Sequence, residues 1–291
     1  MVAALSYFDE SHQLVRDAVR RFVEREILPH IDEWEEAEEF PRELYLKAGV
    51  AGILGIGYPE RYGGSHEGDV FAKVAASEEL MRSGSGGLVA GLGSLDIGLP
   101  PIVKWAKPAV RERVVSQVLA GEKIMALAVT EPSGGSDVTN LKTRAVREGE
   151  HYRVNGSKTF ITSGVRADYY TVAVRTGNEG FGGVSLLLVE KGTPGFTVGR
   201  KLKKMGWWAS DTAELFFDDY LVPVENLIGV ENAGFACIMA NFQSERLSLA
   251  IMANMTAQLA LEESMKWARE RQAFGKPVGR FQVLKHRLAE M

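Results

Sequence analysis

The change of hydrophobic period along the chain limits its fold more than any other sequence feature. Apolar residues recur at helical spacing from residue 1 to about 123, as Leu14, Val15, Ala18 and Val19 do. The period becomes that of strands from about 124 to 232, and helical spacing returns from 233 to the end. Because helical and strand segments are segregated, the pattern predicts an α+β protein and not alternating βαβ units.

Three domains follow from this order. We expect an N-terminal helical bundle over 1–123, a central β-sheet domain, barrel- or sandwich-like, over 124–232, and the start of a C-terminal helical bundle over 233–291. In the first domain, 77–81 and 110–119 are expected to be helical. In the second, "HYRVNGSKTFITSG" alternates around Asn155-Gly156, which predicts a hairpin turn there. Four more segments have strand length: "DYYTVAVRT", "GVSLLLVEK", "GFTVGRKL" and "TAELFFDDY".

Composition and charge exclude several classes of protein. A net charge of −4 gives no electrostatic case for binding nucleic acid. The single cysteine, Cys237, excludes an internal disulfide framework and is expected in the core. The polar residues of the apolar stretch 233–261, such as Asn241 and Gln243, argue against a membrane span and for a helix buried in a bundle. The acidic, amphipathic N-terminus is unlike a secretory signal, so a cytoplasmic location is expected, or the mitochondrial matrix if a transit peptide has been removed.

Familiar catalytic motifs are missing. No G-x-G-x-x-G, G-x-x-x-x-G-K-[ST] or G-x-S-x-G pattern occurs, and the five histidines lack metal-ligand spacing, so no metal is expected. Two segments remain. The loop "AVTEPSGGSD", 128–137, can present N–H groups to a phosphate or heterocycle, or can be an ordinary surface turn. In "KTFITSG", Phe160 and Thr162 are expected on one strand face, which suits a flat ring but also a half-buried strand.

Several long segments in series resemble the acyl-CoA dehydrogenase family. The resemblance is carried by "GILGIGYPERYGG", "MALAVTEPSGGSDVTNLKTRA", "KTFITSG", "KMGWWASDTAELFFDDYLVPVENLIG" and "ARERQAFGKPVGRFQ". It implies an FAD enzyme of fatty acid β-oxidation that converts a fatty acyl-CoA to its trans-2-enoyl-CoA. It also implies electron-transfer flavoprotein as the electron acceptor, and a homo-oligomer, typically a tetramer or otherwise a dimer.

The resemblance also implies which residues contact the flavin. Ser136 is expected near the pyrophosphate and the CoA, and Phe160 takes the place of a tryptophan common in the family. The residues at the C-terminal end are expected to reach the FAD of a neighbouring subunit. The full set is Leu127, Val129, Thr130, Ser136, Phe160, Ile161, Thr162, Arg271, Phe281 and Gln282.

The stretch 233–261 carries only two charges, Glu245 and Arg246, and neither has an opposite charge four residues away. Removing the weakly acidic α-proton of a thioester needs a base, such as a carboxylate whose pKa is raised by an apolar pocket. The pattern Glu245-Arg246-Leu247 resembles the helix that carries the base in the long-chain and isovaleryl subgroups. We therefore expect Glu245 to be the base and Arg246 to shape the substrate site. The alternative is a structural ion pair with other helices.

Other interpretations stay open. In many family members the base is a glutamate in the C-terminal region, which this sequence does not reach, because it ends at Met291 inside an apparent helix. Part of the usual family chain is therefore expected to follow. An acyl-CoA oxidase of the same superfamily, or a non-catalytic relative that binds flavin, would share these motifs.

Overall fold

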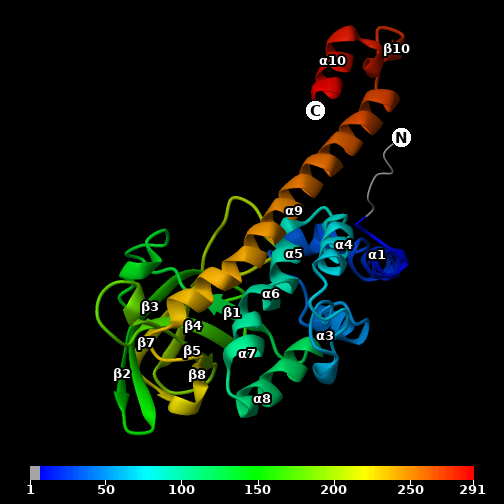
Figure 1. Ribbon diagram of the computed structural model, residues 1–291. Coiled ribbons are helices and arrows are strands. Elements are labelled where there is room, and N and C mark those ends of the chain that lie inside the picture. The colour runs from blue at the N-terminus through cyan, green and yellow to red at the C-terminus, as the bar shows by residue number, and fades with distance from the viewer. Residues whose placement is uncertain (1–6) are drawn as a thin grey trace.

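The computed structural model describes residues 7–291, so the first residues of the N-terminal segment lie outside it. The chain folds as a helical part, a β-sheet and a long helix that leaves the body of the molecule (Figure 1). This order confirms the predicted α+β fold class, with a central sheet between helical parts.

The N-terminal part packs helix α1 against helix α4. Arg20 of α1 donates hydrogen bonds of 2.7 and 3.0 Å to Glu79 of α4, whose side chain is buried. The side chain of Asp9 caps the start of α1 by accepting the N–H of Ser11. The helices predicted at 77–81 and 110–119 are confirmed as parts of α4 and α8. The helices are α1 (Glu10–Phe22), continued by a π-helical turn (Val23–Ile27), α2 (Ile31–Glu36), α3 (Glu43–Val50), α4 (Val70–Met81), α5 (Gly86–Leu92), α6 (Leu95–Gly98), α7 (Pro100–Trp105) and α8 (Pro108–Leu119).

One eight-stranded sheet forms the central part, in the order β6-β7-β3-β2-β4-β5-β8, with β1 paired in parallel to β4. Strands β4 and β5 are buried almost throughout. The Thr171 hydroxyl of β4 donates to the Gly98 carbonyl of α6 at 2.8 Å, and the start of helix α9 packs on β5 at Ser185. The strands are β1 (Met125–Ala128), β2 (Arg144–Glu148), β3 (His151–Thr162), β4 (Tyr169–Arg175), β5 (Val184–Glu190), β6 (Phe196–Lys201), β7 (Thr212–Pro223) and β8 (Leu227–Ile228).

The hairpin predicted at Asn155-Gly156 is wrong. Strand β3 runs unbroken through both residues, and the chain reverses at Gly149-Glu150, between β2 and β3. The pairing of β3 with β7 shifts register at this point. A Cβ atom at position 156 would lie 2.6 Å from the Cα of Thr143, so only glycine permits this approach of the neighbouring strand. The Asn-Gly pair therefore produces an irregularity within a strand and not a turn.

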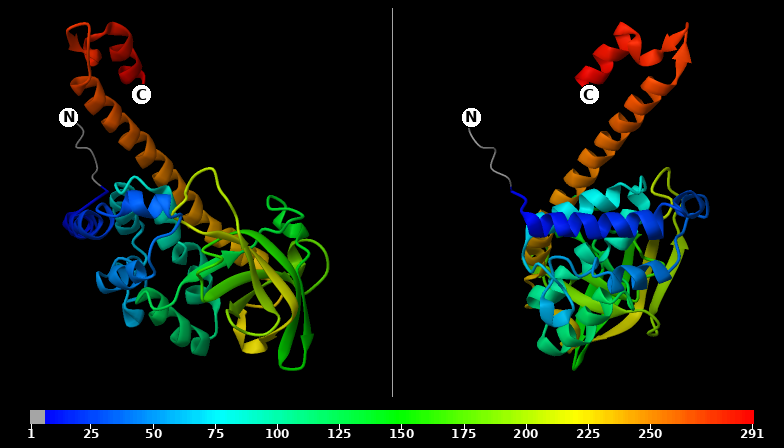
Figure 2. Two further views of the ribbon diagram at one scale, coloured as in Figure 1. Left: turned by 180° about the vertical axis from the view of Figure 1, so that it is seen from behind. Right: turned by 90° about the vertical axis from the view of Figure 1, so that its right-hand side faces the viewer.

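Helix α9 spans Gly234–Glu270 and is longer than the apolar stretch suggested. Cys237 is buried in its first turns, as predicted, and burial raises the pKa of the thiol. The expected burial in a bundle is seen only in part. Beyond Asn241 only Met255 and Ala268 are buried, because no element within residues 7–291 covers the outer face of the helix. Figure 2 shows α9 leaving the body and carrying β9 (Gln272–Ala273), β10 (Lys276–Pro277) and α10 (Gln282–Glu290) at its far end.

Within 7–291 no single helix is both long and apolar enough to cross a membrane. One bent pair of helices in this range, 86–92 with 95–105, has the length and apolar composition of a span when taken together, with an angle of 47° between its halves. Its apolar side chains, including Leu88, Leu99 and Ile102, belong to the buried core.

Candidate active site

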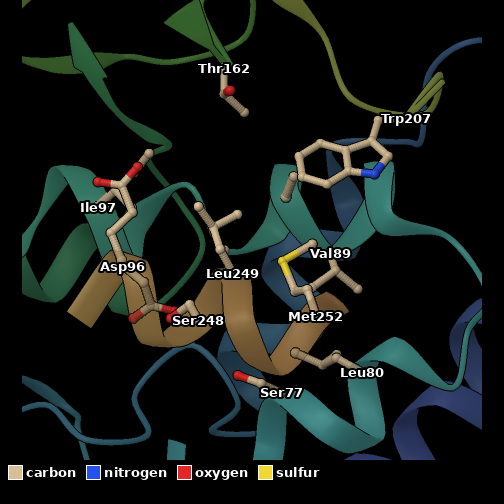
Figure 3. Close-up of a pocket in the computed structure, with 13 residues that line it drawn as sticks. Ser77, Leu80, Val89, Asp96, Ile97, Thr162, Trp207, Ser248, Leu249 and Met252 are labelled. Atoms are coloured by element: carbon tan, nitrogen blue, oxygen red, sulfur yellow. The ribbon is translucent and has the colours of Figure 1, made fainter. Parts of the chain in front are cut away.

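A pocket of about 160 Å³ lies between α9 and the helices α4, α5 and α6 (Figure 3). We call it the Glu245 pocket. Apolar side chains such as Leu80, Val89 and Met252 form much of its wall, and Thr162, at the end of β3, also lines it. The pocket thus brings together the predicted base, Glu245, and one residue predicted to contact a flavin, Thr162.

Glu245 has the surroundings of a carboxylate whose charge is poorly stabilised. Its side chain is half-buried, and its Oε2 atom is buried with no hydrogen-bond partner among residues 7–291. Burial raises the pKa of the Glu245 carboxyl above its usual value, and the neighbouring charge of Arg246 offsets only part of this shift. A carboxylate in this state can take a proton near neutral pH more readily than an exposed one.

Arg246 points elsewhere. It is exposed, does not line the Glu245 pocket, and holds its guanidinium 5.9 Å from the ring centre of Phe242. Neither Glu245 nor Arg246 forms an ion pair with any side chain in the described part of the chain. The alternative of a structural ion pair therefore finds no partner within residues 7–291.

The two segments singled out in the sequence lie side by side. Buried Lys158 of β3 donates from Nζ to the Val129 carbonyl at 3.0 Å and to Oε1 of Glu131 at 2.8 Å. One residue on, the Thr159 N–H donates to the Thr130 carbonyl at 2.9 Å. These three contacts fix the loop after β1 against the end of β3, which is where the resemblance places the flavin.

Glu131 is the centre of this junction. Besides Lys158, its carboxylate accepts the N–H groups of Lys142, at 2.5 Å, and Thr143, at 2.8 Å. Burial by itself raises the pKa of Glu131, but the Lys158 charge and these donors outweigh it, so the pKa lies below its usual value. Burial lowers the pKa of Lys158 to about 8, with Glu131 opposing the shift. At neutral pH both groups are therefore charged.

The remaining predicted flavin contacts differ in where their side chains lie. Leu127 and Thr130 are half-buried, Val129 and Ile161 are buried in the core, and Ser136 is exposed on the loop. The Val129 carbonyl accepts the Lys158 ammonium and the Ile161 carbonyl accepts the N–H of Gly164, so both residues are held by contacts within the protein.

Phe160 is placed by a distortion of β3. The pairing of β3 with β7 shifts register between Lys158 and Ile161, and Phe160 has a left-handed backbone with φ 58°. Its ring is 68% exposed, whereas Thr162 turns into the Glu245 pocket. Regular alternation, which would put both side chains on one face, is therefore broken. A bulky residue in the left-handed region is unusual, and such strain concentrates at functional sites.

The predicted C-terminal contacts lie far from this site. Arg271 directly follows α9, Phe281 precedes α10 and Gln282 begins it. At a rise of about 1.5 Å per residue, the 26 positions from Glu245 to Arg271 span roughly 40 Å of helix. Figure 1 shows these elements at the end of α9 remote from the sheet. They do not join the Glu245 pocket of their own chain.

Sequence reasoning missed most of the residues that line the Glu245 pocket, among them Asp96 and Trp207. Asp96 accepts hydrogen bonds from Lys73 Nζ at 2.8 Å and from the Tyr58 hydroxyl at 3.0 Å. Asp96 is the only charged residue between 83 and 103. An isolated charge in an apolar stretch, the pattern that singled out Glu245, was therefore present at Asp96 as well. Trp207 had no signal of its own, because only the family resemblance distinguishes the segment that contains it. The Lys158–Glu131 pair had no sequence signal, because its two residues are distant in the chain and ordinary in strands and loops.

Comparison with known proteins agrees with this arrangement. Three domain families match in order: the acyl-CoA dehydrogenase N-terminal domain over residues 9–122, the middle domain over 126–220 and the C-terminal domain over 232–291. The chain is 41% identical to the mitochondrial long-chain specific acyl-CoA dehydrogenase of Mus musculus, over 98% of this chain and 66% of that protein. It thus spans slightly less than two thirds of this curated relative.

Solved structures agree as well. A probable acyl-CoA dehydrogenase from Mycobacterium abscessus has a TM-score of 0.94 and 52% identity, covering 97% of this chain and 75% of that one. A chain from the structure of the electron transferring flavoprotein of Acidaminococcus fermentans has a TM-score of 0.94 and 36% identity, covering 99% and 76%. On these matches, the chain belongs to the acyl-CoA dehydrogenase family.

Proposed function

We propose that the protein oxidises a fatty acyl-CoA thioester to the trans-2-enoyl-CoA, with Glu245 as the base. The observation that carries this proposal is the buried Oε2 atom of Glu245, which has no hydrogen-bond partner and belongs to the same apolar pocket as Thr162. Such a carboxylate accepts the α-proton of the thioester as the β-hydrogen leaves as hydride and the double bond forms between the two carbons.

The residues present fit FAD. The exposed side chain of Phe160 offers an aromatic plane, Thr162 lines the Glu245 pocket two residues on, and the Thr159 N–H holds the Thr130 loop next to this end of β3. These residues would hold the isoalloxazine, and we propose Leu127, Val129 and Ile161, which adjoin them in the chain, as further flavin contacts. When bound, FAD supplies the acceptor for the β-hydride.

Residues of the chain define the rest of the reaction site. The apolar wall of the Glu245 pocket takes the acyl group and excludes water, which keeps the pKa of Glu245 raised. Ser136 would meet the CoA or the FAD pyrophosphate on the loop, and Arg246, exposed beside Glu245, would meet the CoA end of the substrate.

Partners follow from the same proposal. The likeness to a chain in the A. fermentans electron transferring flavoprotein structure supports electron-transfer flavoprotein as the acceptor. The remote position of Arg271, Phe281 and Gln282 supports a role at the FAD of a neighbouring copy. We therefore propose a homo-oligomer, a tetramer or a dimer, whose flavin sites are shared between copies.

The first test compares wild type with Glu245→Gln in the full-length flavoprotein, by anaerobic reduction of the flavin with acyl-CoA. Loss of a general base should slow reduction by about 10²–10⁴-fold while acyl-CoA still binds. Glu262→Gln, an exposed change farther along the same helix, is the matched control and should reduce its flavin normally. Normal reduction by Glu245→Gln would place the base elsewhere in the whole protein.

The same experiment separates the other candidate functions. Readmitting oxygen after reduction should recolour the flavin slowly if the protein is a dehydrogenase, and rapidly if it is an oxidase. A wild-type flavin that no acyl-CoA bleaches would instead indicate a non-catalytic flavin-binding relative.

A further inference from the structure

Two cavities meet at one side chain. The Glu245 pocket is lined on α9 by Glu245, Leu249 and Met252. A second cavity of about 460 Å³, which we call the distal groove, is lined by the next turns of the same helix, Thr256, Leu259, Ala260 and Glu263. Trp207 lines both. Figure 3 shows its indole beside Val89 and Met252, on the side of the Glu245 pocket away from Asp96.

The two cavities follow one face of α9. Positions 245, 249, 252, 256, 259 and 263 recur at intervals of three or four residues, which places them along one side of the helix. With a rise of about 1.5 Å per residue, the Glu245 pocket extends roughly 10 Å along α9, and the distal groove continues the strip by more than another 10 Å. An acyl chain that starts at Glu245 and follows this strip therefore meets Trp207 before it reaches the groove.

Trp207 is held in an unusual state. Its backbone is left-handed, with φ 57°, a conformation that bulky residues rarely adopt. Two glycines of α5 make room for it: a Cβ on Gly86 would lie 2.5 Å from the indole Nε1, and one on Gly87 would lie 2.7 Å from the Trp207 carbonyl carbon. Gly87 thus packs against the Trp207 backbone and Gly86 against its indole, and these contacts hold the strained residue in place.

We propose that Trp207 is the end wall of the acyl site and limits the length of acyl chain that the enzyme accepts. This inference rests on the proposed function, because it requires the acyl group to occupy the Glu245 pocket. Trp207 lines both cavities, so its indole lies where the Glu245 pocket would continue into the distal groove. A shorter side chain at this position joins the two cavities and lets a longer chain pass.

The test is the ratio of kcat/KM for palmitoyl-CoA to that for octanoyl-CoA, measured in full-length, flavin-loaded protein. Trp207→Ala should raise this ratio at least about tenfold, since even one methylene gained or lost in a hydrophobic pocket is worth 10-fold or more. Trp207→Phe keeps a ring against Gly86 and should raise the ratio by less. This milder variant also provides the answer if the alanine variant does not fold.

Trp208→Ala is the matched control. Trp208 is the next residue and is about as exposed as Trp207, at 45% against 47%, but it lines neither cavity and its indole donates to the Lys204 carbonyl at 3.0 Å. Its loss should leave the ratio unchanged. An unchanged ratio in both Trp207 variants, or an equal rise in Trp208→Ala, would overturn the end-wall role. If no acyl-CoA reduces the wild-type flavin, the proposed function itself fails and the end wall fails with it.

Discussion

Glu131, in the loop after β1, and Glu245, on α9, are both withdrawn from water but have opposite surroundings. Glu131 is 4% exposed and accepts hydrogen bonds from Lys158 and from two backbone N–H groups. Glu245 is half-buried, and its Oε2 atom meets no donor among residues 7–291.

The difference teaches that donors, and not burial alone, decide what a withdrawn carboxylate does. Burial raises the pKa of both groups, but in Glu131 the Lys158 charge and the N–H donors reverse the shift. Glu131 is thus kept as an anion that joins two segments. Glu245 is left able to exchange a proton, as a base must be.

The largest expected effect comes from removing the cation that pairs with Glu131. Lys158→Met leaves the Glu131 charge buried without its cation, since the lysine side chain is fully buried. Removing one partner of a buried pair costs about 3–5 kcal/mol of unfolding free energy. Denaturant unfolding measures this loss, and flavin content should fall with it because the loop after β1 loses its tie to β3.

Lys266→Met supplies the comparison variant for that experiment. Lys266 is 63% exposed and lies 3.9 Å from Glu263, so its removal should cost less than about 1 kcal/mol. Equal losses in the two variants would show that the Lys158–Glu131 pair contributes no more than a surface pair.

A second, smaller effect should appear when both members of the pair are changed. Lys158→Met combined with Glu131→Gln removes both charges, so no unpaired ion stays buried. The double variant should be less destabilised than the sum of the single variants by about 0.5–3 kcal/mol. A double-mutant cycle from denaturant unfolding gives this coupling directly, and strict additivity would contradict the pairing.

The order of domains could be predicted because hydrophobic period is a property of each segment alone. Glu245 could be singled out for a similar reason, since an unpaired charge in an apolar helix is visible in the sequence. Asp96 carried the same local signal between two apolar runs. The short side chain of Asp96 is partnered by Lys73 and Tyr58, and these partners come from other elements.

What could not be predicted depends on contacts between distant segments. The preference of Asn-Gly for turns describes isolated hairpins. Here the close approach of Thr143 requires glycine at position 156, and β3 pairs with β7 on both sides of it. Alternation puts Lys158 and Phe160 on one face, yet the register shift after Lys158 buries the lysine and exposes the ring. The position of Trp207 at the Glu245 pocket depends on Gly86, which is distant in the sequence and leaves room for the indole.

The last prediction concerns the smallest effect and tests the two glutamates against each other by pH. The folded pKa of Glu131 is lowered, so its stabilisation is present above the unfolded value, near 4.5, and is lost as pH falls through the folded pKa. The folded pKa of Glu245 is raised, so its contribution is present below 4.5 and is lost as pH rises through the folded pKa. Each proton contributes a slope of at most about 1.4 kcal/mol per pH unit. The unfolding free energy of the wild type, less that of Glu131→Gln, should therefore increase with rising pH. The same difference taken with Glu245→Gln should decrease with rising pH. Two slopes of the same sign would mean that the donors around Glu131 do not distinguish it from Glu245.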